Sequence, residues 1–205
     1  MKIRTSAIAA IALTAALSLT GCATGNDSAA PSTTETTTET TAQTADSQAL
    51  PDGVNQSDVM FAQMMIPHHE QAIEMSDIIL AKEGVDPEVI SLAEAVKAAQ
   101  GPEIEQLQGW LDAWGVGSGG QDMGHMGHGD GIMTEDDLGK LEKADGAEAS
   151  KLWLEQMIMH HEGAVEMAEL EAAGGSDPAA VELANSIVET QTVEIDQMRE
   201  LLEAM

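Results

Sequence analysis

The second half of this chain repeats the residue pattern of the first half. Seven positions around a double histidine recur at a constant offset of 92, since 153 − 61 = 92 and 160 − 68 = 92. The first copy comprises Phe61, Met65, His68, His69, Glu70, Ala72 and Met75, and the second comprises Trp153, Met157, His160, His161, Glu162, Ala164 and Met167. Further along, Asp86-Pro87 and Gln100-x-x-Glu103 recur as Asp177-Pro178 and Gln191-x-x-Glu194 at an offset of 91. Units that repeat in this way bury their apolar faces against one another, so the chain is expected to fold as two similar, mutually dependent halves.

Each half has the pattern of a pair of helices. Apolar residues recur every three or four positions through the double-histidine segments, as at Phe61, Met65 and Ala72, which predicts helices with one apolar seam. The helices of a half are joined by Gly84-Val85-Asp86-Pro87 or Gly174-Gly175-Ser176-Asp177-Pro178, and such residues are typical of a helix end followed by a capped helix start. The sequence therefore predicts an all-α fold, an antiparallel four-helix bundle built from two duplicated helical hairpins. Pro67 is expected to kink the first helix or to mark its start near Ile66.

The N-terminal residues have the pattern of an export signal. Lys2 and Arg4 precede an apolar run over residues 7–19, which is too short to span a bilayer comfortably. The run ends in Leu19-Thr20-Gly21-Cys22, which resembles the lipobox of bacterial lipoproteins, where the cysteine is lipidated and becomes the new N-terminus. The resemblance implies a signal peptide over residues 1–21 and an exported protein anchored to the cell membrane, facing the extracytoplasmic side, by a lipid on Cys22. The alternative is an ordinary secreted signal peptide with a chance cysteine.

Composition separates a tether from a folded domain. Residues 22–56 are rich in Thr, Ser and Glu and poor in large apolar residues, so they are expected to be a disordered tether. Residues 57–205 are expected to form the bundle domain, with halves at 57–114 and 134–205 and a loop rich in Gly, Met and His at 115–133. The net charge of −28 argues against binding of nucleic acid or anionic lipid headgroups, so the membrane is expected as a partner only through the lipid anchor.

Polar residues interrupt the apolar seams at matching places in the two halves. They are His68, Gln100 and Glu103 in the first half and His160, Gln191 and Glu194 in the second. In a hairpin that turns near Val85, His68 lies level with about residue 102, so each histidine is expected to face the glutamine and glutamate of its own half. Buried polar groups need partners, and two alternatives remain: a network in which each imidazole donates a hydrogen bond to a glutamate, or a metal ion. His69 and His161, about 100° further round their helices, are expected at a helix interface or at the surface.

All six histidines of the chain lie in three clusters flanked by methionines. The candidate metal ligands in the helices are Met65, His68, His69, Met157, His160 and His161, and those in the loop are Met123, His125, Met126 and His128. Imidazole and thioether donors together suit copper better than magnesium, calcium or manganese, so a copper ion is the expected cofactor. Cu(I) is expected to prefer the thioether-rich loop, and Cu(II) the imidazole and carboxylate groups of the helices. The alternatives are core packing for the helical methionines and a chance polar stretch for the loop.

These motifs together are similar to one known family. The segment Phe-x-x-x-Met-x-x-His-His, its copy beginning with Trp and the Gln-x-x-Glu segments resemble the domain-of-unknown-function 305 family over about residues 57–205. The resemblance implies a ferritin-like four-helix bundle in an exported bacterial protein, and some members are associated with copper binding or copper resistance. The family's motif falls on Met65, His68, His69, Met157, His160 and His161 of this chain.

Three functions are compatible with the sequence. The first is a lipid-anchored extracytoplasmic protein that binds and sequesters copper. The second is a metal-free helical interaction module of the cell envelope. The third, a di-iron ferritin-like oxidase or store, requires Glu-x-x-His motifs on facing helices, and the chain contains no Glu-x-x-His. No catalytic residue is predicted, because the sequence has no P-loop, dinucleotide fingerprint or nucleophile–base arrangement.

Overall fold

The computed structural model of the protein describes residues 49–117 and 131–205. Within these ranges the chain forms five α-helices and no strand: α1 (Gln56–Leu80), α2 (Pro87–Trp114), α3 (Glu135–Lys143), α4 (Gly146–Gly174) and α5 (Pro178–Ala204). The all-helical class predicted from the sequence is therefore confirmed. None of the helices in the described ranges combines the length and apolarity needed to cross a membrane. The predicted signal peptide and nearly all of the tether lie outside the described residues.

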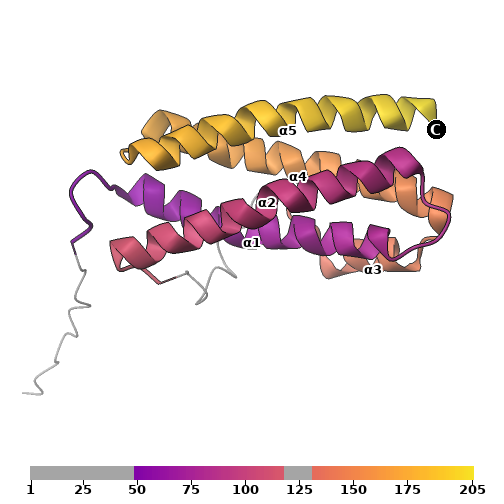
Figure 1. The fold of residues 1–205 in the computed structure, drawn as a ribbon, viewed down its shortest axis with the longest axis horizontal. Helices are drawn as coiled ribbons and strands as arrows, with labels where there is room; N and C mark the ends of the chain where they lie inside the picture. The colour runs from indigo at the N-terminus through magenta and orange to yellow at the C-terminus, as the bar shows by residue number, and fades with distance from the viewer. Residues whose placement is uncertain (1–48, 118–130) are drawn as a thin grey trace, which may run out of the picture. The chain divides into compact units, whose positions relative to one another are not determined.

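The four long helices form two hairpins, and the first helix of one hairpin contacts the first helix of the other. Helix α1 packs against α2, helix α4 packs against α5, and α1 also packs against α4 (Figure 1). Helices α1 and α4 run antiparallel, because Asn55 Nδ2 donates to Gly174 O at one end (2.8 Å) and Lys82 Nζ donates to Ala144 O at the other (3.0 Å). The seam between α1 and α4 is therefore where the two repeats meet.

The turns between paired helices have the residues that the sequence predicts. Asp86 Oδ1 accepts from the amide of Glu88 (2.8 Å), and Asp177 Oδ1 accepts from that of Ala179 (2.8 Å), so both aspartates cap the helix that follows. Gly84 adopts φ +75°, which favours glycine. Helix α1 begins at Gln56 and continues through Pro67, so the alternative that the helix starts near Ile66 is wrong.

Helix α3 is an element that the sequence analysis did not predict. It follows the residues expected as a loop, and it packs against α1 and α4 (Figure 1). Its start has a capping box, in which Asp137 N donates to Thr134 Oγ1 (3.2 Å) and Thr134 N donates to Asp137 Oδ2 (3.3 Å). Leu141 is fully buried and holds the helix against the hairpins.

The hydrophobic core is divided into two clusters along the helix axes. Each cluster takes residues from all four long helices. One includes Met75, Val96, Trp153, Met157 and Met198, and the other includes Phe61, Met65, Leu107, Ala164 and Ile187. The residues between the clusters are the predicted polar ones, so a polar layer crosses the protein between two apolar regions.

Candidate metal centre

His68 of α1 and His160 of α4 meet at the seam between the two repeats. Their ring centroids are 3.8 Å apart with the ring planes tilted by 42°, and their exposed fractions are 1 % and 0 %. Each histidine occupies a position of the apolar seam that faces the other hairpin. The duplication therefore places the same residue of each repeat against its counterpart.

The rings of this pair have no hydrogen-bond partners. Nδ1 and Nε2 of both His68 and His160 are buried, and within the described residues none of the four nitrogens forms a hydrogen bond. An unpaired buried polar atom costs about 1–3 kcal/mol, and native proteins carry few of them. Four such atoms at one place make the His68–His160 pair the candidate site of the described residues.

The second histidine of each motif bonds to a glutamate of its own hairpin. His69 Nε2 lies 2.7 Å from Glu103 Oε2, and His161 Nε2 lies 2.8 Å from Glu194 Oε2. Both imidazoles are fully buried, whereas the two glutamate side chains are 20 % exposed. The Nδ1 atom of each of these histidines is also buried without a partner among the described residues.

This arrangement corrects the pairing expected from the sequence. We predicted that Glu103 would face His68 and Glu194 would face His160, but each glutamate bonds to the neighbouring histidine, His69 or His161. The reason is geometric: a residue that faces the other hairpin cannot also face its own partner helix, and the next residue is turned by about 100° towards that helix. His69 and His161 therefore lie at a helix interface and not at the surface.

The two glutamines complete the layer. Gln100 and Gln191 are 2 % and 3 % exposed, and the Oε1 atom of each is buried without a hydrogen-bond partner in the described part of the chain. Gln100 lies about one turn before Glu103, and Gln191 lies about one turn before Glu194. All predicted members of the polar layer thus lie between the two apolar clusters.

Burial keeps the central rings uncharged. Desolvation, followed by the neighbouring rings of His69 and His161, lowers the pKa of His68 to about 3. Desolvation and the nearby ring of His68 hold the pKa of His160 well below its ordinary value. At neutral pH both imidazoles are therefore neutral, and each has one ring nitrogen with a free lone pair.

Met65 and Met157 lie on opposite sides of the histidine pair. Each is fully buried and precedes its histidine by one helical turn, and the helices are antiparallel, so Met65 belongs to one apolar cluster and Met157 to the other. In the described ranges, no group of three or more His, Cys, Asp or Glu side chains converges in a way that could hold an ion.

The remaining predicted site residues cannot be placed. Met123, His125, Met126 and His128 fall in residues 118–130, and Cys22 falls in residues 1–48, all of which are outside the described ranges.

A buried pair of carboxyl groups at the start of α1 was missed by sequence reasoning. Asp58 accepts hydrogen bonds from the amides of Ser176 (2.9 Å) and Asp177 (3.0 Å), and Glu171 accepts one from Ser57 Oγ (2.8 Å). Burial and the adjacent Asp58 raise the pKa of Glu171 to about 7. Only the capping position of Asp58, three residues after Asn55, is visible as a signal in the sequence.

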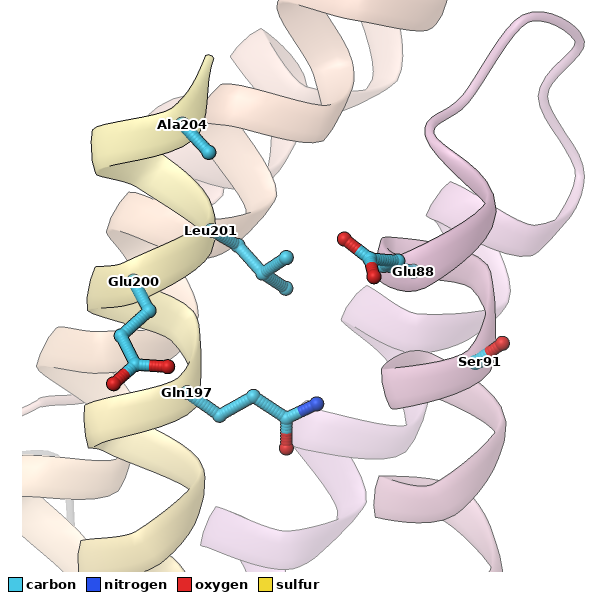
Figure 2. Close-up of a pocket in the computed structure, with 6 residues that line it drawn as sticks. All are labelled: Glu88, Ser91, Gln197, Glu200, Leu201 and Ala204. Carbon is cyan, nitrogen blue, oxygen red and sulfur yellow. The ribbon is translucent and has the colours of Figure 1, made fainter.

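Two of the cavities on the described surface are lined by residues other than the histidines. One of about 570 Å³ separates α2 from α5, with Glu88 of α2 and Gln197 and Leu201 of α5 pointing into it (Figure 2). The other, of about 370 Å³, follows the seam between α1 and α4 and is lined by Met60, Met64 and Met167 among others.

Comparison with known proteins identifies relatives of this arrangement. The sequence model of the family described as "Domain of unknown function (DUF305)" matches residues 58–202. A DUF305 protein from Streptomyces coelicolor is 34 % identical, with a TM-score of 0.67 over 72 % of this chain and 93 % of its own. A DUF305 fragment from Deinococcus radiodurans is 28 % identical, with a TM-score of 0.68 over 74 % of this chain and 99 % of its own. CopM in its Cu(II)-bound form is 31 % identical, with a TM-score of 0.62 over 72 % of this chain and 96 % of its own, and CopM has also been solved with Cu(I) and with Ag. A search of curated proteins finds no match.

Proposed function

This chain belongs to the DUF305 family, and from that premise we propose that it is an extracytoplasmic copper-binding protein whose buried histidines hold Cu(I). One observation carries the proposal. Six ring nitrogens of four neighbouring histidines, His68, His69, His160 and His161, are buried without a hydrogen-bond partner in the described residues. A protein that kept these atoms only for packing would be more stable with apolar side chains in their place.

The pair His68 and His160 supplies the central ligands in this proposal. Both rings are neutral at neutral pH, so a metal ion does not compete with protons for their lone pairs. Met65 and Met157 offer a thioether on either side of the pair, which is the donor type that selects Cu(I).

The glutamates orient the second histidine of each motif. Each imidazole of His69 and His161 donates Nε2–H to a carboxylate, which fixes the ring tautomer and leaves Nδ1 as an acceptor facing away from the glutamate. A histidine held in this way by a carboxylate is typical of metal ligands. Since no three such side chains converge in the described residues, we propose that His69 and His161 flank the pair His68 and His160 and do not themselves complete the centre.

We propose Cu(I) for these helices in place of the Cu(II) expected from the sequence. We expected Cu(II) at the imidazoles and carboxylates, but Glu103 and Glu194 bond to His69 and His161. A buried ion at the central pair would then have neutral donors only, which favours the monovalent and softer ion. CopM has been solved with Cu(II), with Cu(I) and with Ag, so this similarity supports copper binding in general and not one oxidation state.

The proposal includes the setting of the protein. The lipobox-like Leu19-Thr20-Gly21-Cys22 supports export and anchoring by a lipid on Cys22, and residues 22–56 would then tether the domain. We also infer that the two hairpins form the antiparallel, ferritin-like four-helix bundle expected from the duplication, because α1 and α4 are antiparallel and each packs against its own partner helix.

A titration with Cu(I) against a competing chelator tests the function. We expect His68→Leu with His160→Leu to remove the tightest bound Cu(I), whereas His125→Ala with His128→Ala should reduce the number of bound ions without touching that site. Glu88→Gln with Glu200→Gln is the matched control, because these carboxylates line the cavity between α2 and α5 and report any copper held only by acidic surface. If the leucine variant holds as much Cu(I) as the wild type and as tightly, the histidine pair is not the copper site. If the wild type holds no more copper than an acidic surface accounts for, the copper assignment is wrong and the metal-free interaction module takes its place.

A further inference from the structure

Three methionines share the cavity on the seam between α1 and α4. Met60 and Met64 are four residues apart on α1 and so lie on one face of the helix, and Met167 belongs to α4. Met60 is 44 % exposed, and Met64 and Met167 are half-buried. The adjacent residues Phe61 and Met65 fill the core on α1, so core packing does not require Met60 and Met64, whereas Met167 also packs against the same cluster.

The surface at the equivalent position of the second repeat is covered by another helix. At an offset of 92, Met60 and Met64 correspond to Leu152 and Gln156. Helix α3 covers that equivalent surface: Gln156 Nε2 donates to Asp137 O (2.9 Å), and Leu152 packs against the cluster that contains Leu141 of α3. The surface at Met60 and Met64 has no such helix in the described residues, and it has thioethers where the covered one has an amide and an isobutyl group.

The cavity lies in line with the buried histidine pair. Met64 precedes His68 by four residues, a rise of roughly 6 Å on the same side of α1. Met167 follows His160 by seven residues, which again returns to the same side of α4, roughly 10 Å away. Because the histidine rings are 1 % and 0 % exposed, an ion needs a route to them, and the seam begins at this cavity.

We propose that Met60, Met64 and Met167 form a solvent-facing capture site for Cu(I), from which the ion passes to the buried histidine pair. The inference rests on the proposed function. Thioether sulfur is a soft, uncharged donor that selects Cu(I) over hard cations, and three such donors around one cavity are a suitable set for it.

The other polar groups of the cavity fit an uncharged site. Glu171 is its one carboxyl group, and Ser57 Oγ donates to it (2.8 Å). Burial and the neighbouring Asp58 raise the pKa of Glu171 to about 7, so near neutrality much of this carboxyl is protonated. The lining therefore offers little negative charge to magnesium or calcium, which prefer ionised oxygen ligands.

The first test follows each methionine separately in the whole protein. The methionine methyl groups are labelled with carbon-13, and Ag(I), a soft monovalent ion that does not change oxidation state, is added stepwise. We expect the methyl resonances of Met60, Met64 and Met167 to shift in the first additions, together with the ring resonances of His68 and His160. If the histidine resonances shift and these three methyl groups do not, the capture site is wrong and the proposed function stands. If neither set shifts, both are wrong.

The second test measures copper with the thioethers removed. Met60→Leu, Met64→Leu and Met167→Leu together keep the apolar volume, and Met75→Leu, Met133→Leu and Met198→Leu, all buried elsewhere, are the matched control. We expect the first variant alone to bind one Cu(I) fewer per chain and to load the histidine pair more slowly. Equal stoichiometry and equal loading rates in the two variants would overturn the proposal, since the three methionines would then be only surface packing.

Discussion

Glu171 offers a test of the structure in which a substitution stabilises the protein. Its side chain is 1 % exposed in the last turn of α4, where carbonyl groups already concentrate negative charge. Gly175 lies so close that a side chain there would collide with the Glu171 carboxyl. Asp58 is beside it, and amide hydrogen bonds from Asn55, Ser176 and Asp177 help to lower the pKa of that neighbour. Of these two carboxyl groups, that of Glu171 is therefore the one that holds a proton.

The magnitude follows from the pKa of Glu171. Burial, followed by the hydrogen bond with Asp58, raises this pKa from 4.5 to about 7, which corresponds to about 3 kcal/mol at about 1.4 kcal/mol per pH unit. Because the folded-state pKa lies above the unfolded value, the associated stability is fully present below about pH 4.5 and is lost as the pH rises through about 7. Glutamine has the size of the protonated acid and cannot ionise, so Glu171→Gln should escape this loss.

Urea denaturation of copper-free protein at pH 5 and pH 8 measures the effect. We expect the free energies of unfolding of wild type and Glu171→Gln to be similar at pH 5, and the variant to be more stable by up to about 3 kcal/mol at pH 8. Glu169→Gln, on the exposed side of the same helix, is the control for removal of any carboxylate from α4. If Glu171→Gln and Glu169→Gln change the stability equally at both pH values, Glu171 is ionised in the folded protein and the reasoning is refuted.

Four further outcomes are expected. His68→Leu with His160→Leu should leave the copper-free protein as stable as wild type or stabilise it, as judged from urea midpoints, because four unpaired ring nitrogens are removed. His161→Ala should instead cost about 1–3 kcal/mol in the same assay, because Glu194 then loses its partner. Acid titration followed by circular dichroism should show wild type losing stability as the pH falls below 6.5, since the His68 pKa is lowered to about 3 in the folded state, and the double leucine variant should lose less. Cys22→Ser should move the protein out of the membrane fraction or leave an unprocessed precursor on an immunoblot, and correctly cleaved protein that stays in the membrane would contradict the lipid anchor.

Sequence periodicity predicts the hairpins because the residues that set them act locally. Asp86 and Asp177 each precede a helix that begins with proline. The side chain of each aspartate accepts a hydrogen bond from an amide only two residues further along the chain. The apolar spacing around Phe61 and Trp153 likewise predicts which face is buried. Family membership follows from the same motifs, and it is confirmed over residues 58–202.

The arrangement inside the polar layer could not be predicted in the same way. The estimate that His68 lies level with residue 102 carries an error of a residue or more, and one residue turns a side chain by about 100°. An error of one residue is enough to change the predicted partner of Glu103 from His69 to His68. In the structure, Glu103 bonds to His69. Helix α3 was missed because its nine residues bury only Leu141 fully, so no apolar period was visible.

The polar layer across the core also affects how the protein opens. In the metal-free protein, the layer between the apolar clusters around Trp153 and around Phe61 contains several buried nitrogen and oxygen atoms without partners, so we expect it to couple the two ends weakly. Each end can then unfold as a cooperative unit of its own, and native-state hydrogen exchange would report two sets of amide protection. An ion bound by His68 and His160 would tie α1 to α4 at the boundary and merge the two units into one. Bound metal would thus raise protection in amides far from the ligands, at both ends of the helices at once.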